Sequence, residues 1–100
     1  MLIYHIVTPE VWDAQKDREF YEAASLATEG FIHCSYRHQL EAVLERYYAN
    51  AERVVILTIN PNLLEAKLIG EASTGGEIYP HVYGGINAAA IVEASEKHLR

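Results

Sequence analysis

The chain has 100 residues, half of them hydrophobic and 22% charged, and its formal net charge at pH 7 is -6. This size and balance predict a single globular domain over residues 1–100. The acidic surplus and the scattered Lys and Arg residues disfavour nucleic-acid binding, although a small nucleotide in a local pocket stays compatible. The apolar runs are far shorter than the roughly 20 residues that cross a bilayer. With one cysteine and therefore no internal disulfide, we expect a cytoplasmic protein without membrane partners.

The first third of the chain predicts one strand and a short helix. Residues 2–7 are rich in β-branched side chains, which favours a strand. Pro9 suits the first turn of a helix, so we expect a short helix over residues 9–17. Residues 19–30 predict a loop or a turn of helix that ends at Gly30, because glycine readily adopts the left-handed C-cap conformation.

The middle of the chain predicts a strand over residues 31–35, followed by the longest helix, over residues 36–50. Ser35 is the expected N-cap of this helix. The apolar positions follow the spacing of one buried helical face. They are Leu40, Val43, Leu44, Tyr47 and Tyr48.

The remaining residues predict mainly strands. Residues 53–59 are almost continuously apolar, as in a central strand that is covered on both faces. Residues 68–72 and 77–83 predict two further strands, and Pro80 indicates an edge strand or a bulge. Residues 86–94 predict a final strand or a short helix. Strands that concentrate after the helices favour an α+β fold with a mixed or antiparallel sheet.

Three histidines lie in predicted strands among apolar neighbours: His5, His33 and His81. A buried imidazole costs free energy unless it finds a hydrogen-bond partner, so three of them suggest a shared polar site. Alternation along a strand places His81 on the same face as Glu77, Tyr79 and Tyr83. We therefore expect the three histidines to be buried and to lie within one pocket.

Two other site chemistries are weighed against this pocket. Cys34 follows His33 directly, but adjacent strand residues point to opposite faces, so the histidine is poorly placed to act as its base. We expect Cys34 to be buried and unreactive. The three histidines could also hold a metal ion, but none of the usual metal-ligand spacings is present, and no metal is predicted.

Longer strings of residues resemble the bacterial domain of unknown function 952 family over nearly the whole chain. The segments that carry this resemblance are Ile3-Tyr4-His5-Ile6, Glu29-Gly30-Phe31-Ile32-His33-Cys34-Ser35 and Pro80-His81-Val82-Tyr83-Gly84. The resemblance implies a fold similar to that of ADP-ribosyltransferases. In that fold a small, mixed and strongly bent sheet with two main helices holds NAD in its opening.

In that larger group, a His or Arg on the first strand holds the nicotinamide ribose. A hydroxyl or aromatic residue supports the ring, and a Glu at the start of a later strand stabilises an oxocarbenium-like transition state. By position, the resemblance assigns these three roles to His5, Ser35 and Glu77. Ile6 follows His5 where that group often has Gly, so the resemblance favours a nucleotide-like pocket over a complete transferase.

The leading hypothesis is therefore a pocket that binds NAD or a related nucleotide. Its catalytic residues are expected to be Glu77 and His5. Its ligand-binding residues are expected to be His33, Ser35, His81, Tyr79, Tyr83 and Arg37. Arg37 lies at the start of the predicted helix, where a phosphate would be favoured. Two alternatives stay open: a noncatalytic ligand-sensing or protein-interaction module whose histidines are structural, and a metal-dependent hydrolase that uses the three histidines.

Overall fold

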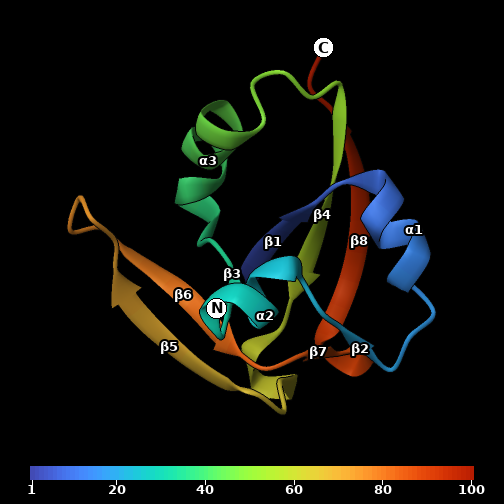
Figure 1. Cartoon of the computed structure of the whole chain (residues 1–100), viewed down its shortest axis with the longest axis vertical. Helices are drawn as coiled ribbons and strands as arrows, with labels where there is room; N and C mark the ends of the chain where they lie inside the picture. Colours follow the sequence, from blue (N-terminus) through green and yellow to red (C-terminus); the bar gives the residue numbers. More distant parts are fainter.

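Eight strands form three small antiparallel sheets, and three α-helices pack around them (Figure 1). The computed structural model describes all residues, Met1–Arg100. The α-helices are α1 (Pro9–Gln15), α2 (Ala24–Glu29) and α3 (Leu40–Tyr47), and the single 3-10 turns are η1 (Arg37–Gln39), η2 (Pro61–Leu63) and η3 (Ala88–Ala90). The strands are β1 (Ile3–Val7), β2 (Phe20–Tyr21), β3 (Ile32–His33), β4 (Arg53–Ile59), β5 (Lys67–Ala72), β6 (Ile78–Tyr83), β7 (Ile86–Asn87) and β8 (Ile91–His98). No helix is long and apolar enough to span a bilayer.

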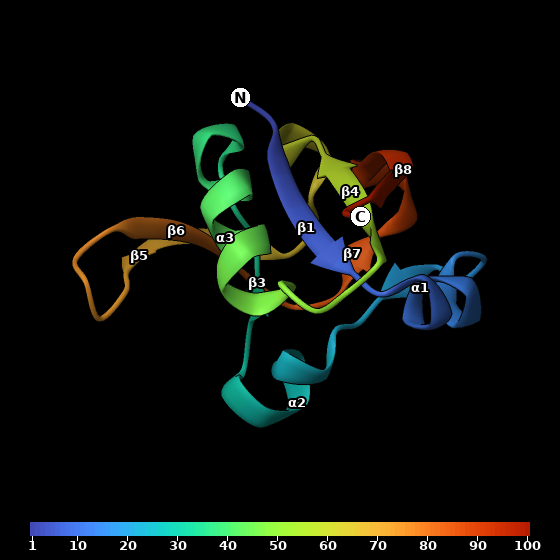
Figure 2. The ribbon, with the colours of Figure 1, turned by 90° about the horizontal axis from the view of Figure 1, so that it is seen from above.

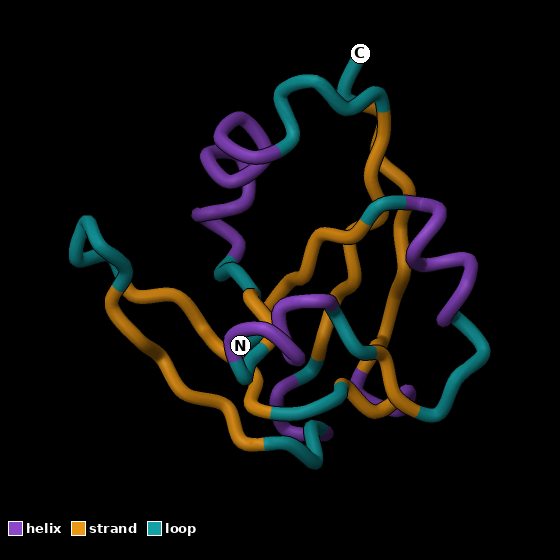
Figure 3. Tube along the Cα trace, viewed as in Figure 1, coloured by secondary structure: helices purple, strands orange, loops and turns teal.

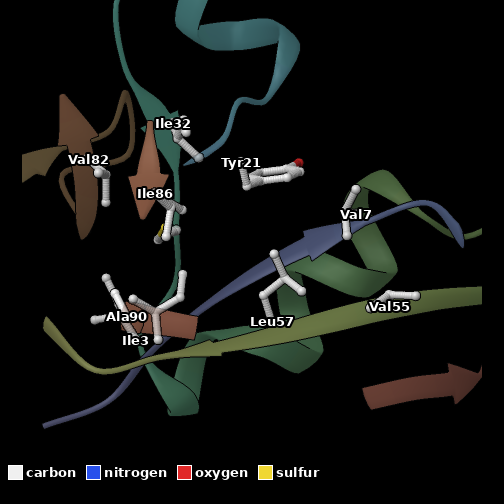
Figure 4. Packing of buried hydrophobic residues seen from close by; sticks show 11 residues of the cluster. Ile3, Val7, Tyr21, Ile32, Val55, Leu57, Val82, Ile86 and Ala90 are labelled. Carbon is white, nitrogen blue, oxygen red and sulfur yellow. The ribbon is translucent and has the colours of Figure 1, made fainter. Parts of the chain in front are cut away.

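The largest core lies on one face of the sheet β1-β4-β8. β4 is its middle strand, which confirms the central position expected for residues 53–59. Leu57, at the centre of β4, is 0% exposed. Figure 4 shows side chains of the β1–β4 pair facing Ile32, Ile86 and Tyr21, which come from the other two sheets. The buried cluster therefore joins all three sheets into one domain.

A smaller core lies on the opposite face of the β1–β4 pair. Ile6 and Val54 pack there against Leu44 of α3. Seen from above, α3 and α1 lie on different sides of this pair (Figure 2). Four of the five apolar positions expected on the buried face of α3 pack against this cluster or belong to it, whereas Tyr47 is 69% exposed.

The sheet β3-β6-β5 projects from the body as a long hairpin. Its turn lies at the edge of the molecule, between two strands (Figure 3). β6 is the middle strand, so the edge position expected from Pro80 is wrong. The carbonyl of Pro80 accepts a hydrogen bond from the Cys34 amide at 3.0 Å, on the side away from β5. Because N–H and C=O of one strand residue point to the same side, the missing N–H of Pro80 removes no bond to β5.

Several local predictions differ from the structure. The α+β class and the antiparallel pairing are confirmed, but the strands form three sheets in place of one, and there are three α-helices in place of two. α3 begins only at Leu40, because the Gln39 side chain accepts the Tyr36 amide at 2.9 Å and holds a preceding 3-10 turn. Tyr36, not Ser35, is the N-terminal cap residue of that turn. Gly30 does end α2 with a φ of 89°, as predicted.

Candidate functional site

The outer face of the sheet β3-β6-β5 carries a group of aromatic and titratable side chains that contact one another. His33 pairs directly with His81 across the β3–β6 ladder, and Glu71 pairs with Tyr79 across the β5–β6 ladder. Paired residues and their i±2 neighbours share one face of a sheet. We call this surface the histidine face; its aromatic and titratable residues are Phe31, His33, Lys67, Glu71, Tyr79, His81 and Tyr83. The buried residues Ile32 and Val82 occupy the opposite, core-facing side.

His81 is held by a carboxylate within the histidine face. Its Nδ1 donates a hydrogen bond to Oε1 of Glu71 over 2.7 Å, which leaves Nε2 without a protein partner. The hydroxyl of Tyr83 donates to the same Glu71 oxygen. The Tyr83 hydroxyl and the His81 imidazole hold the pKa of Glu71 below its usual range, while the Glu71 carboxylate raises the pKa of Tyr83. The pair can therefore present a basic imidazole nitrogen that is backed by an ionised carboxylate.

Phe31 joins the two histidines of this face. Its ring stacks on His81 at a centroid distance of 4.0 Å and meets the edge of His33 at 4.8 Å. His33 also faces a carboxylate, since its Nε2 lies 3.2 Å from Glu29 at the end of α2. The two imidazole centroids are 5.4 Å apart. Each histidine thus has its own acidic partner, and both contact one aromatic ring.

His5 lies behind this face, inside the core. Its Nδ1 donates to the backbone carbonyl of His33 at 2.6 Å, and its Nε2 accepts a hydrogen bond from the Tyr21 hydroxyl at 2.8 Å. Burial lowers the pKa of His5 to about 4, so the ring is neutral at pH 7. With both nitrogens occupied and 7% of the residue exposed, His5 has no free polar atom for a ligand. The ligand-holding role expected for His5 thus has no polar atom left to serve it, and the contacts of His5 tie β1 to β2 and β3.

Glu77 directly precedes β6, at the end of that strand away from His81. Its carboxylate accepts a hydrogen bond from Nε2 of Gln39 at 2.9 Å and one from the Tyr79 hydroxyl at 3.4 Å. It lies four positions before His81, a span of roughly 13 Å along an extended chain. The sequence predicts one buried pocket for Glu77 and three histidines, but the structure separates Glu77 from them. Of the three histidines, only His5 is fully buried. His33 is exposed, and His81 is half-buried.

Ser35 and Arg37 also lie away from the histidine face. Ser35 is 5% exposed and exchanges backbone hydrogen bonds with Tyr4 at 2.7 and 2.8 Å. Arg37 lines an open groove of about 910 Å³ beside the N-terminus, together with Tyr4 and Tyr36. The helix N-terminus expected to hold a phosphate is a three-residue 3-10 turn, and Gln39 already accepts the Tyr36 amide there.

Three residues that shape these sites were not predicted from the sequence. Glu71 and Glu29 hold the two histidines, and Gln39 bonds to the carbonyl of Ile78 at 2.7 Å. Glu71 could have been identified from the sequence, because a hairpin around the turn at residues 73–76 places it beside His81. Gln39 is 2% exposed. The feature of the sequence that could have indicated this residue is a polar side chain at the start of an amphipathic helix.

The geometry also excludes a metal site made of the three histidines. No group of three His, Cys, Asp or Glu side chains is placed to hold a metal ion. Both ring nitrogens of His5 are engaged in hydrogen bonds within the core. The three-histidine hydrolase is therefore not supported by this arrangement.

Cys34 is expected to react slowly with thiol reagents. It is 3% exposed, and burial raises its pKa to about 12, so little thiolate is present at pH 7. Labelling with a disulfide reagent at pH 7 should be at least about tenfold slower in native protein than in urea-unfolded protein. Equal rates in the two states would contradict the buried position.

Comparison with known proteins places the chain in a family. The model of the family described as "Protein of unknown function (DUF952)" matches residues 6–94. The chain belongs to this family. The match includes every residue of the histidine face and begins directly after His5. No curated protein matches the chain.

Solved structures of one relative share the fold. The crystal structure of protein CC0527 from Caulobacter crescentus is 29% identical, with a TM-score of 0.89, over 100% of this chain and 89% of that one. A double mutant of CC0527 gives the same TM-score and coverage at 28% identity. The solution NMR structure of CC0527 gives 0.84 at 29% identity, over 99% of this chain and 86% of that one. This DUF952 chain therefore shares its whole architecture with CC0527.

Proposed function

We propose that the histidine face binds the nicotinamide-ribose part of NAD or a related nucleotide, and that His81 and Glu71 act on the bound ribose. The observation that carries this proposal is the His81–Glu71 pair, whose Nε2 has no protein partner. Such a nitrogen can accept a proton or hydrogen-bond a ribose hydroxyl. The resemblance to ADP-ribosyltransferases supplies the candidate ligand.

The two carboxylates at the histidine face suit the nicotinamide-ribose half of NAD. Glu29 and Glu71 pair only with histidines there, and no Lys or Arg forms an ion pair with either carboxylate. Carboxylates favour positive charge, and the nicotinamide ring of NAD is a planar cation. The rings of Phe31 and Tyr83, with centroids 5.4 Å apart, provide aromatic surface against which such a ring is attracted.

The same charge would favour cleavage of the bond between nicotinamide and ribose. An oxocarbenium-like transition state places positive charge on the ribose, and a nearby carboxylate stabilises it. Glu71 is better placed for this role than Glu77, because it contacts His81 directly. In this mechanism Glu71 stabilises the ribosyl cation while the free nitrogen of His81 accepts the proton of the attacking hydroxyl.

Thermal unfolding with added ligand tests this proposal. Ligand at a hundredfold excess over its dissociation constant should stabilise the protein by about 2.7 kcal/mol. NAD, nicotinamide mononucleotide and AMP would be compared at millimolar concentration, and we expect the first two to raise Tm more than AMP. His81→Ala and Glu71→Gln should each weaken binding by at least about tenfold, because each removes a charge-assisted hydrogen bond.

A matched control is available on another surface. His98 lies 3.5 Å from Glu96 on β8, and its side chain is 71% exposed. His98→Ala therefore removes a histidine beside a carboxylate without touching the histidine face, and it should leave the ligand-induced shift unchanged. If no nucleotide shifts Tm, the proposal fails, and the interaction module with structural histidines becomes the better interpretation.

A further inference from the structure

A second hollow lies on a different side of the molecule, between α1 and β8. It has a volume of about 280 Å³, and its lining includes Trp12, Lys16, Arg18, Tyr21 and Glu93. Pockets for drug-sized ligands begin at about 300 Å³, so this one has room for a single ring with a small substituent. We propose that it binds a small ligand that combines a planar ring with an anionic group, such as an aromatic carboxylate or an aryl phosphate.

The backbone around this hollow is fixed before any ligand arrives. Gln15, the last residue of α1, bonds twice to the backbone of Glu22: its Nε2 donates to the carbonyl at 3.0 Å, and its Oε1 accepts the amide at 2.8 Å. These bonds close the loop that carries Lys16 and Arg18. A preformed wall reduces the entropy that binding would otherwise cost.

Two aromatic side chains form the apolar part of the lining. The rings of Trp12 and Tyr21 lie 6.1 Å apart with an interplanar angle of 54°. Tyr21 is held in place because its hydroxyl bonds to His5. Trp12 is half-buried and Tyr21 is 3% exposed, so the Trp12 ring offers the aromatic surface for a ligand ring and Tyr21 supports it from behind.

The charged part of the lining favours an anion, although the whole chain carries a charge of -6. Arg18 forms no ion pair with any acidic side chain of the protein. Lys16 lies 3.6 Å from Asp13, and both side chains are more than half exposed. Such an exposed pair is weak. Against these two cations the lining holds one carboxylate, Glu93. An unpaired guanidinium binds a carboxylate or phosphate through two parallel hydrogen bonds.

Trp12 is the only tryptophan, so its fluorescence reports directly on this hollow. Phenyl phosphate and benzoate would be titrated into the full-length protein, with benzyl alcohol as the neutral ring and inorganic phosphate as the anion without a ring. We expect saturable changes with the two ring anions and binding roughly tenfold weaker with the other two, since each lacks one of the two contacts. Comparing phenyl phosphate with benzoate distinguishes the two kinds of anion.

Two variants decide whether the contacts are those proposed. Arg18→Gln should weaken binding of the ring anions by roughly tenfold, whereas Lys67→Gln, which removes an equal charge from exposed β5, should not. Backbone amide chemical shifts should change at residues 12–21 and 88–94 when phenyl phosphate is added. Equal binding of benzyl alcohol, equal loss in both variants, or shift changes elsewhere would overturn the proposal. His81→Ala should leave this binding intact, so the outcome is independent of the nucleotide test.

Discussion

His5→Ala is expected to lower the free energy of unfolding by about 3–5 kcal/mol, the range seen when a large core side chain is removed and buried polar partners lose their bonds. The ring is buried, and its removal would leave the Tyr21 hydroxyl and the His33 carbonyl without their partner in the core. Domains of this kind have a total stability of about 5–15 kcal/mol, so the variant would be close to unfolding. Urea denaturation followed by circular dichroism would measure the loss.

Two comparisons separate this structural role from a general effect of losing a histidine. His98→Ala, at a site that is 71% exposed, should change stability by less than about 0.5 kcal/mol. Tyr21→Phe removes only the hydroxyl that donates to His5 and should have a smaller effect of about 1–2 kcal/mol. If His5→Ala unfolds at the same urea concentration as the wild type, the hydrogen-bonded core position of His5 is wrong.

Mild acid is expected to destabilise the protein through the same residue. The pKa of His5 is about 4 in the folded state, against an ordinary value of 6.5, because burial disfavours the imidazolium. Between these two pH values the unfolded chain binds a proton that the folded protein excludes. Stability from this group is therefore complete above about pH 6.5 and falls as the pH drops towards 4. The total loss amounts to about 3 kcal/mol.

Most carboxylates stay ionised between pH 7 and pH 5, and a comparison with a His5 variant subtracts what the other four histidines contribute in this window. Free energies of unfolding would be measured at several pH values in this window, for the wild type and for His5→Gln. The wild type should lose stability as the pH falls, and His5→Gln, although less stable, should show a shallower slope. Parallel slopes in the two proteins would contradict a neutral, buried His5.

Most strands could be predicted because their signals are local. The apolar run at residues 53–59 and the Gly-containing turn before β6 define the central strand and the hairpin without any long-range information. The start of α3 could not be predicted in this way. Ser35 is a common N-cap residue, but its backbone is used by Tyr4, a residue 31 positions earlier in the chain. Tertiary pairing thus decided where the helix begins.

The site could be predicted only in part, for a similar reason. Alternation within β6 places Tyr79, His81 and Tyr83 on one face, and the β5–β6 register agrees. The partners of His5 depend on packing between β1 and the other sheets, which alternation cannot reveal, although its burial was predicted. His5 shares a strand face with Ile3 and Val7, both members of the main core cluster, and that fact already favoured the buried interior.

The pairing of β4 also determines how late the central sheet can form during folding. Its two ladders join residues far apart in the chain, since Ile3 pairs with Ile59 and Arg53 pairs with His98. Closing such long loops costs conformational entropy before any core contact is gained. The β5–β6 hairpin has no such cost, because Ala72 pairs with Ile78 across a short turn. β5 and β6 can therefore pair early, whereas His5 finds its two partners only when β2 and β3 pack against β1.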